Sequence, residues 1–298
     1  MMKKLDQNIL KNSANQGKEN NYRLIMKKKL SEKHPVLGLL LFTYGGFIVA
    51  EFLIGVVAAL VLSEFGFDTR TMAAVSGCIG SILVLILWYL INQPKYRFMP
   101  RKGEISGSFK LILIPMLVYW AMIFGVFAYF CKGFPFAPIG MREFFMAVMA
   151  GFVEEVCFRE IAVSYMAKHW MSEKNIPLIA IASGVLFGLT HITNVLSNEL
   201  IDTLYQVVLC ILTGVFYAAI YLRKGNVWVL CLFHSVHDIL TFMASAGVTA
   251  KGVTEIPDWY LTFVVAIEFV LCLYGFFLIR KAKRQEIIDL WDYKWSRN

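Results

Sequence analysis

The sequence predicts an all-α, polytopic membrane protein of about eight transmembrane helices that enclose a polar cavity. Three observations support this fold class: the apolar composition, the length of the apolar runs and the distribution of basic residues among the loops. Of the 298 residues, 58% are hydrophobic and 17% are charged, and the mean hydropathy is +0.61. Soluble domains carry about a quarter of charged residues, so this composition is typical of a membrane protein.

Eight apolar runs are the predicted membrane spans. A helix rises about 1.5 Å per residue, so about 20 apolar residues cross the roughly 30 Å of hydrocarbon in a bilayer. Repeated runs of this length exclude a soluble protein with a large core. The fourth and seventh runs contain charged residues, and hydropathy alone indicates them weakly. The predicted spans are Pro35–Leu62, Met72–Ile91, Phe109–Cys131, Met141–Ala167, Ile176–Thr193, Ile201–Leu222, Val227–Ser245 and Pro257–Ile279.

Basic residues alternate between the loops in a way that predicts the topology. Lys and Arg gather in both tails and in the second, fourth and sixth loops, whereas the odd loops are poor in base. Because basic loops face the cytoplasm, the pattern predicts an even number of spans with both termini cytoplasmic. We expect the bacterial plasma membrane as the location. The basic residues of the even loops are Lys95, Arg97, Arg101, Lys102, Lys168, Lys174, Arg223 and Lys224.

The chain divides into a membrane domain and two tails. Residues 1–34 read as a polar, basic cytoplasmic tail, and they lack the apolar core of a signal peptide. Residues 35–280 form the eight-helix membrane domain. Residues 281–298 are basic and amphipathic with Trp291 and Trp295, so we expect them to lie in the cytoplasmic interface or to bind a partner.

Charge and cysteine content exclude other classes of function. The net charge of +8 is explained by topology and by anionic lipid headgroups as partners, and no aromatic-interleaved basic motif indicates nucleic-acid binding. The six cysteines include no CxxC pair, which argues against zinc-ribbon and thioredoxin-like sites. We interpret them as small buried hydrophobes.

Ionisable residues inside the bilayer cost free energy and therefore indicate function. The fourth span contains Glu154, Glu155, Arg159 and Glu160. Arg159 is four residues after Glu155, which allows an ion pair on one helix face, whereas Glu154 points elsewhere. One carboxylate can then be structural while the other is free to act as a general base. A helix-end salt bridge is the simpler alternative, but it leaves Glu154 and Glu160 unexplained.

Histidines mark two further spans. The fifth contains Phe187 and His191, and a lone histidine in an apolar helix is more often a packing residue than a catalyst. The seventh contains His234, His237 and Asp238. His234 and Asp238 are one helical turn apart and share a face, and three polar groups in one short span favour a common purpose.

Together the three clusters resemble the CAAX protease and bacteriocin-processing (CPBP, or Abi) family of intramembrane glutamate proteases, which includes the type II CAAX prenyl endopeptidases. The family pattern is EExxxR, FxxxH and HxxxN or HxxxD on successive membrane helices. The resemblance covers residues 140–245, and order, spacing and placement all agree. The matching segments are Glu154-Glu155-Val-Cys-Phe-Arg159, Phe187-Gly-Leu-Thr-His191 and His234-Ser-Val-His237-Asp238.

The resemblance implies a metal-independent endopeptidase that needs no cofactor. Glu154 and His191 would activate a water, and His234 with Asp238 would stabilise the oxyanion. The substrate would be a membrane-associated peptide or a lipidated, prenylated protein. The chain also lacks the GxSxG, GxGD and HExxH motifs of other proteases. The residues with a supporting role are Glu155 and Arg159.

Two features depart from this expectation. Asp238 stands where prenyl proteases have Asn, and an ionised Asp accepts hydrogen bonds without donating any. It could orient a histidine, stay protonated or join Glu154, His191 and His234 as a divalent-metal ligand. In addition, His191 and His234 lie at helix depths that differ by about 12 Å, if counted at about 1.5 Å per residue from the predicted span ends.

Two alternatives to the protease stay open. A non-enzymatic membrane partner, such as a bacteriocin immunity protein or a regulator of a sensor kinase, could keep the fold without turnover. A proton-coupled transporter is less favoured, because transporters often show repeated halves and this chain shows none. The complete set of motif residues favours the enzyme.

Overall fold

The computed structural model describes residues 33–64, 68–93, 95–253 and 256–296. The chain divides into two compact units, residues 1–41 and 42–298. The described part of the first unit is the start of helix α3 (Pro35–Ile48). All the residues of the candidate site lie in the second unit.

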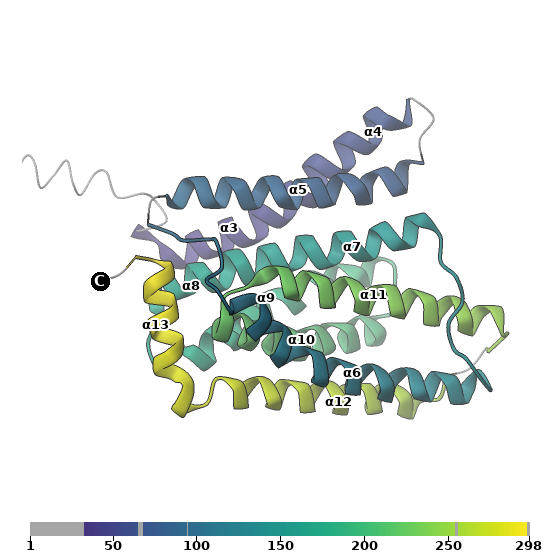
Figure 1. Ribbon diagram of the computed structural model, residues 1–298. Coiled ribbons are helices and arrows are strands. Elements are labelled where there is room, and N and C mark those ends of the chain that lie inside the picture. Colours follow the sequence, from purple (N-terminus) through teal and green to yellow (C-terminus); the bar gives the residue numbers. More distant parts are fainter. Residues whose placement is uncertain (1–32, 65–67, 94, 254–255, 297–298) are drawn as a thin grey trace, which may run out of the picture. The chain divides into compact units, whose positions relative to one another are not determined.

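Every regular element among the described residues is a helix, which confirms the predicted all-α class (Figure 1). Two elements, η1 and η2, are π-helical, and two others, η3 and η4, are 3₁₀-helical. After α3 the elements are η1 (Val49–Val56), α4 (Val57–Ser63), α5 (Thr69–Asn92), α6 (Glu104–Phe130), α7 (Met141–Glu155), η2 (Val156–Ile161), α8 (Ala162–Trp170), α9 (Ile176–Thr190), η3 (His191–Leu196), α10 (Leu200–Lys224), α11 (Val227–Ala250), α12 (Asp258–Leu278), η4 (Lys281–Lys283) and α13 (Arg284–Lys294).

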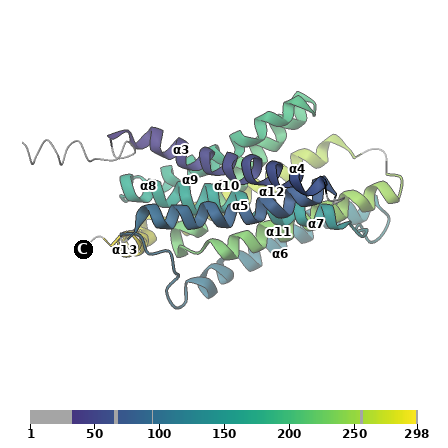
Figure 2. The same cartoon turned by 90° about the horizontal axis from the view of Figure 1, so that it is seen from above.

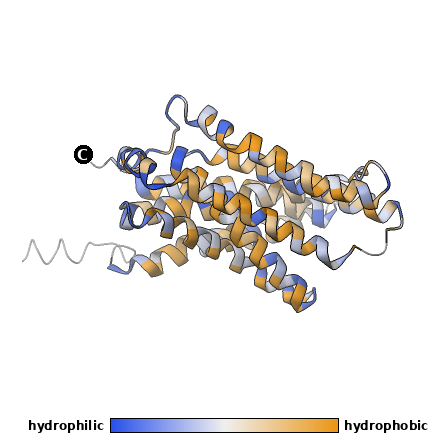
Figure 3. Ribbon diagram, turned by 90° about the horizontal axis from the view of Figure 1, so that it is seen from below, coloured by the Kyte–Doolittle hydropathy of each residue, from blue (hydrophilic) through white to orange (hydrophobic). Residues whose placement is uncertain are grey.

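Seven helices in the described part of the chain are long and apolar enough to cross a membrane, and the protein is an integral membrane protein. Hydrophobic residues run along these helices, and hydrophilic residues gather at their ends (Figure 3). They correspond to seven of the eight predicted spans. The fourth predicted span is the continuous helical stretch α7–η2–α8, whose charged residues and short α-helical segments keep it out of this set. An eighth span therefore stays a prediction.

The even loops gather at one end of the second unit, where α13 packs across the helix ends (Figure 1). Trp291 Nε1 donates to the Leu222 carbonyl at 3.1 Å, and Trp295 Nε1 donates to the Ser164 carbonyl at 2.9 Å. Both indoles are buried. The expectation that these tryptophans lie in the lipid interface is therefore wrong, because Leu222 of α10 and Ser164 of α8 accept their N–H groups inside the protein.

The third and seventh loops meet at the opposite end of the second unit. The Ala137 amide donates to the Met243 carbonyl at 3.0 Å, and Lys251 Nζ donates to the Cys131 carbonyl at 3.3 Å. The third and seventh loops are thereby joined. This grouping agrees with the predicted alternation of the spans, while the orientation of the two ends relative to the cytoplasm stays a prediction.

Glycines let the motif-bearing helices approach one another closely. A Cβ atom at Gly151 of α7 would lie 2.3 Å from Ser235 Oγ and 2.9 Å from the Cys231 carbonyl oxygen of α11. Figures 1 and 2 both show α7 and α11 side by side. Gly184 and Gly188 of α9 contact α10 in the same way. Small residues four apart are the usual means of close helix packing in membranes.

Candidate active site

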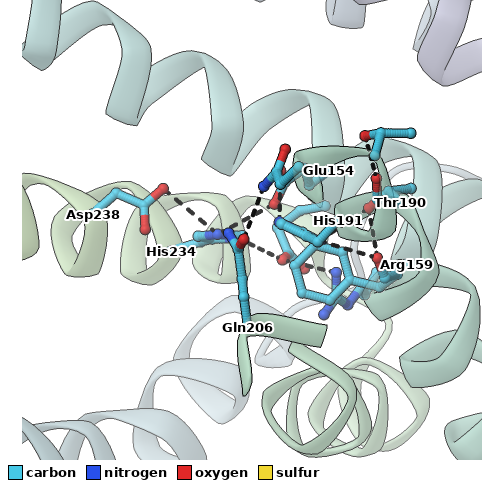
Figure 4. A network of polar contacts seen from close by, with 11 residues as sticks. Glu154, Arg159, Thr190, His191, Gln206, His234 and Asp238 are labelled. Carbon is cyan, nitrogen blue, oxygen red and sulfur yellow. Dashed lines mark hydrogen bonds and ion pairs between the residues drawn. The ribbon is translucent and has the colours of Figure 1, made fainter. Parts of the chain in front are cut away.

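Glu154 lies between the histidines of the second and third motifs (Figure 4). One carboxylate oxygen is 4.0 Å from His191 Nε2, and the other is 3.4 Å from His234 Nε2. Glu154 is near the end of α7, His191 directly follows α9, and His234 is in α11. The depth difference inferred from the span ends therefore does not separate the histidines, and the three motif residues converge.

Glu155 and Arg159 form the predicted ion pair. Their closest N–O distance is 3.1 Å, and both side chains are fully buried. The guanidinium carbon lies 4.5 Å from the centre of the Phe187 ring and 5.6 Å from that of Tyr217. Arg159 is in the π-helix η2, and π-helical turns are frequent at functional sites. Stacking on Phe187 gives the aromatic residue of the second motif a physical role.

The His234 imidazole is surrounded by three carboxylates. Its Nδ1 is 2.8 Å from Glu155, and its Nε2 is 3.4 Å from Glu154 and 3.7 Å from Asp238. Because a carboxylate oxygen accepts hydrogen bonds, the short contact with Glu155 has Nδ1–H as its donor. Glu155 therefore bridges Arg159 and His234, and fixes the direction in which Nε2 points.

His191 is oriented by the end of its own helix. Its Nδ1 lies 3.4 Å from the Phe187 carbonyl oxygen and 3.1 Å from Thr190 Oγ1. Since a carbonyl only accepts, the first contact makes Nδ1 the donor. The Nε2 atom of that tautomer carries a lone pair toward Glu154, so His191 is suited to accept a hydrogen bond from a water between the two groups.

These side chains open into one cavity of about 620 Å³. The sequence predicts a polar cavity, and the cavity is polar where the motif residues line it. Helices α6, α7, α9, α10, α11 and α12 all contribute to its walls, which are mainly apolar. The motif residues that line it are Glu154, Arg159, Phe187, His191, His234, His237 and Asp238.

Residues 141–240 match the family described as type II CAAX prenyl endopeptidase Rce1-like. This segment is Rce1-like. It covers about a third of the chain and contains all three motifs, which confirms the resemblance drawn from them. The match indicates the general class of protein, an intramembrane endopeptidase of the CAAX protease type. No curated protein and no solved structure was found to be similar to the chain.

One contact at the cavity wall joins His237 of the Rce1-like segment to a tryptophan of α6. Trp120 Nε1 of α6 donates to His237 Nδ1 at 3.2 Å. Since Nδ1 accepts, the proton of a neutral His237 ring is on Nε2. His237 was noticed in the sequence without a role. Nothing in the sequence relates Trp120 to it, because the contact joins residues 117 positions apart.

The donor geometry also bears on a metal. In the described part of the chain, no group of three or more His, Cys, Asp and Glu side chains is arranged to hold a metal ion. The four candidate ligands of the Rce1-like segment lie near one another without forming such a group. Metal-independent catalysis stays a prediction, and chelation is its test.

Proposed function

We propose that the protein is an endopeptidase in which Glu154 and His191 activate a water, without a metal, for attack on a peptide bond. The observation that supports this most is a single carboxylate that faces two imidazoles at 4.0 and 3.4 Å inside a cavity. These distances exceed direct hydrogen bonds. They suit groups that act through a shared water or a substrate atom.

In the reaction, the water oxygen attacks the carbonyl carbon of the substrate and its proton passes to Glu154. His191 Nε2 accepts a hydrogen bond from the second O–H of the same water and orients it, and that hydrogen stays on the oxygen. When the tetrahedral intermediate collapses, the carbon–nitrogen bond breaks and Glu154 returns the proton to the departing amine. General acid–base catalysis of this kind contributes about 10²–10⁴-fold in rate.

The developing oxyanion needs hydrogen-bond donors, and Asp238 is poorly suited to be one. We assign the donors to histidines. His234 can donate from both ring nitrogens when it is an imidazolium, with Glu155 and Asp238 as its counter-charges at 2.8 and 3.7 Å. His237 offers Nε2–H because Trp120 occupies its Nδ1. Asp238 then acts through His234, as an orienting and charge-balancing group.

The substrate follows from the cavity walls. Mainly apolar walls inside a membrane protein suit a membrane-associated peptide or a lipidated protein. His234 is seven residues into α11 from the even-loop end, which corresponds to a depth of about 10 Å at about 1.5 Å per residue. With the predicted topology, cleavage would occur near the cytoplasmic face.

The test is cleavage by purified protein in detergent of internally quenched peptide pools, with Glu154→Ala and His191→Ala as variants and Glu173→Ala, an exposed residue, as the matched control. We expect both site variants to lose at least about 100-fold in kcat/KM and the control to keep full activity. Full activity in both site variants would refute the proposal. Loss on adding chelator to the wild type, reversed by a divalent metal, would refute its metal-independent part.

A further inference from the structure

A second buried carboxylate lines the cavity outside the motifs. Glu268 is in α12, is 3% exposed and faces the cavity. Thr213 Oγ1 of α10 donates to one of its oxygens at 2.6 Å, and Tyr119 of α6 lies beside it. Glu268 belongs to none of the three sequence motifs, and it is a lone glutamate inside an otherwise apolar stretch.

Glu268 differs in its partners from two other buried carboxylates, Glu155 and Glu104, and it differs from the buried Glu160 in that it lines the cavity. Glu155 is paired with Arg159 at 3.1 Å, and Glu104 has Arg101 at 3.0 Å. Within the described residues, no ion pair of Glu268 with a Lys, Arg or His is found, and Thr213 is a neutral partner. A carboxylate placed in a membrane interior without a counter-charge is costly, and such a position favours a ligand that supplies the charge.

The same chamber holds Glu268 and the proposed reaction site. Cys210 also lines this cavity, and it lies close enough to Glu154, Asp238 and Glu268 to be affected by the charge of each. Arg159 is the guanidinium on this wall, and it already faces Glu155. Charges interact strongly where water is scarce, so the cavity presents an excess of carboxylate to whatever enters it.

We propose that Glu268 is a specificity-determining residue, which binds the cationic side chain of a lysine or arginine in the peptide substrate. The inference rests on the proposed function. The apolar stem of the side chain would lie along the neighbouring walls, for example Phe127 and Val264, as the stems of long basic residues commonly do. Glu154 would act on the backbone of the same peptide.

The experiment compares pools of internally quenched peptides that are identical apart from one position, which is lysine, norleucine or glutamate in turn. We expect the wild type to prefer lysine over norleucine in kcat/KM at one position by about tenfold or more, since truncating a buried charge pair costs at least that much. Glu268→Gln should abolish the preference while it keeps cleavage of the norleucine pool. Glu173→Gln, an exposed carboxylate, is the matched control.

Two results would overturn the inference. One is a wild type that cleaves the pools with no preference for lysine at any position, which needs no variant to fold. The other is a lysine preference that survives in Glu268→Gln, because an amide keeps the hydrogen bonds and removes only the charge. In either case the proposed function itself would stand.

A binding measurement separates the two proposals. Fluorescent lysine and norleucine pools are titrated against Glu154→Gln and against the double variant Glu154→Gln/Glu268→Gln. A lysine preference of about tenfold that disappears in the double variant supports the role of Glu268, even if the wild type cleaves nothing and the proposed function fails. Equal binding of both pools to Glu154→Gln would overturn it.

Discussion

Glu154 and Glu160 lie six residues apart on the helical stretch α7–η2–α8, and their surroundings differ: Glu160 is 1% exposed, whereas the Glu154 side chain is 12% exposed. Each oxygen of Glu160 accepts a hydrogen bond from a phenol, one from Tyr96 and one, at 2.5 Å, from Tyr221. Glu154 faces two imidazoles at distances beyond direct hydrogen bonding and opens to a cavity.

The difference shows that burial by itself does not make a membrane carboxylate catalytic. Each oxygen of Glu160 has a protein donor, and the two hydrogen bonds connect η2 to the second loop and to α10. Fully satisfied polar clusters of this kind rigidify a structure. Glu154 is held in place with capacity left over for a water or a substrate. We infer a chemical role for Glu154 and a structural role for Glu160.

Substituting Glu154 and Glu160 separately tests whether the first acts in the chemistry and the second in stability. Glu154→Gln should lower kcat by about 100-fold or more and leave the melting temperature in detergent nearly unchanged. Glu160→Ala should leave two buried phenols without an acceptor and lower the free energy of unfolding by about 3 kcal/mol. For a chain of this size, that corresponds to a fall of roughly 6–12 °C in melting temperature.

The control is the kcat of folded Glu160→Ala measured well below its melting temperature. A value close to that of the wild type separates stability from chemistry. If instead Glu154→Gln melts far below the wild type while Glu160→Ala loses turnover, the two roles are reversed.

Local rules accounted for much of this arrangement from sequence. Apolar run length and loop charge are properties of single segments, and they yielded seven of the helices that the structure contains. The ion pair of Glu155 with Arg159 follows from helical spacing alone. The burial of Trp291 and Trp295 was not predicted, because an amphipathic helix with tryptophans suits a lipid interface and a protein surface equally well.

Contacts between distant segments were beyond sequence reasoning. Trp120 and His237 are far apart in the chain, and so are Thr213 and Glu268. Glu268 is an ionisable residue inside a predicted span, but its partner Thr213 lies on another helix, so no spacing along its own helix indicates a role. The depth of His191 was misjudged because spacing along one helix says nothing of how differently oriented helices cross.

Removing the indole N–H near His237 tests whether His237 is a donor to the oxyanion. Trp120→Phe keeps the ring that stacks on Phe233, with centroids 5.9 Å apart, but loses the hydrogen bond to His237 Nδ1. The His237 imidazole can then carry its proton on Nδ1 instead, and in that tautomer it has no Nε2–H to donate. A hydrogen bond of about 1 kcal/mol corresponds to about a fivefold fall in kcat. Steady-state kinetics should show this fall with KM unchanged; an unchanged kcat would remove His237 from the oxyanion site.

The smallest effect on stability should come from Lys294, which lies near Glu160. Lys294 is 1% exposed, and burial lowers its pKa below the ordinary value, against the opposing pull of Glu160 and Glu104. Between that lowered pKa and the unfolded value of about 10.4, the unfolded chain binds more protons than the folded chain. The free energy of unfolding therefore rises with pH across this window. Melting temperatures measured from neutral to alkaline pH should show the rise in the wild type and lose it in Lys294→Met. An identical pH profile in both proteins would mean that Lys294 is as well hydrated as a surface lysine. Water would then also reach the surroundings of Glu160.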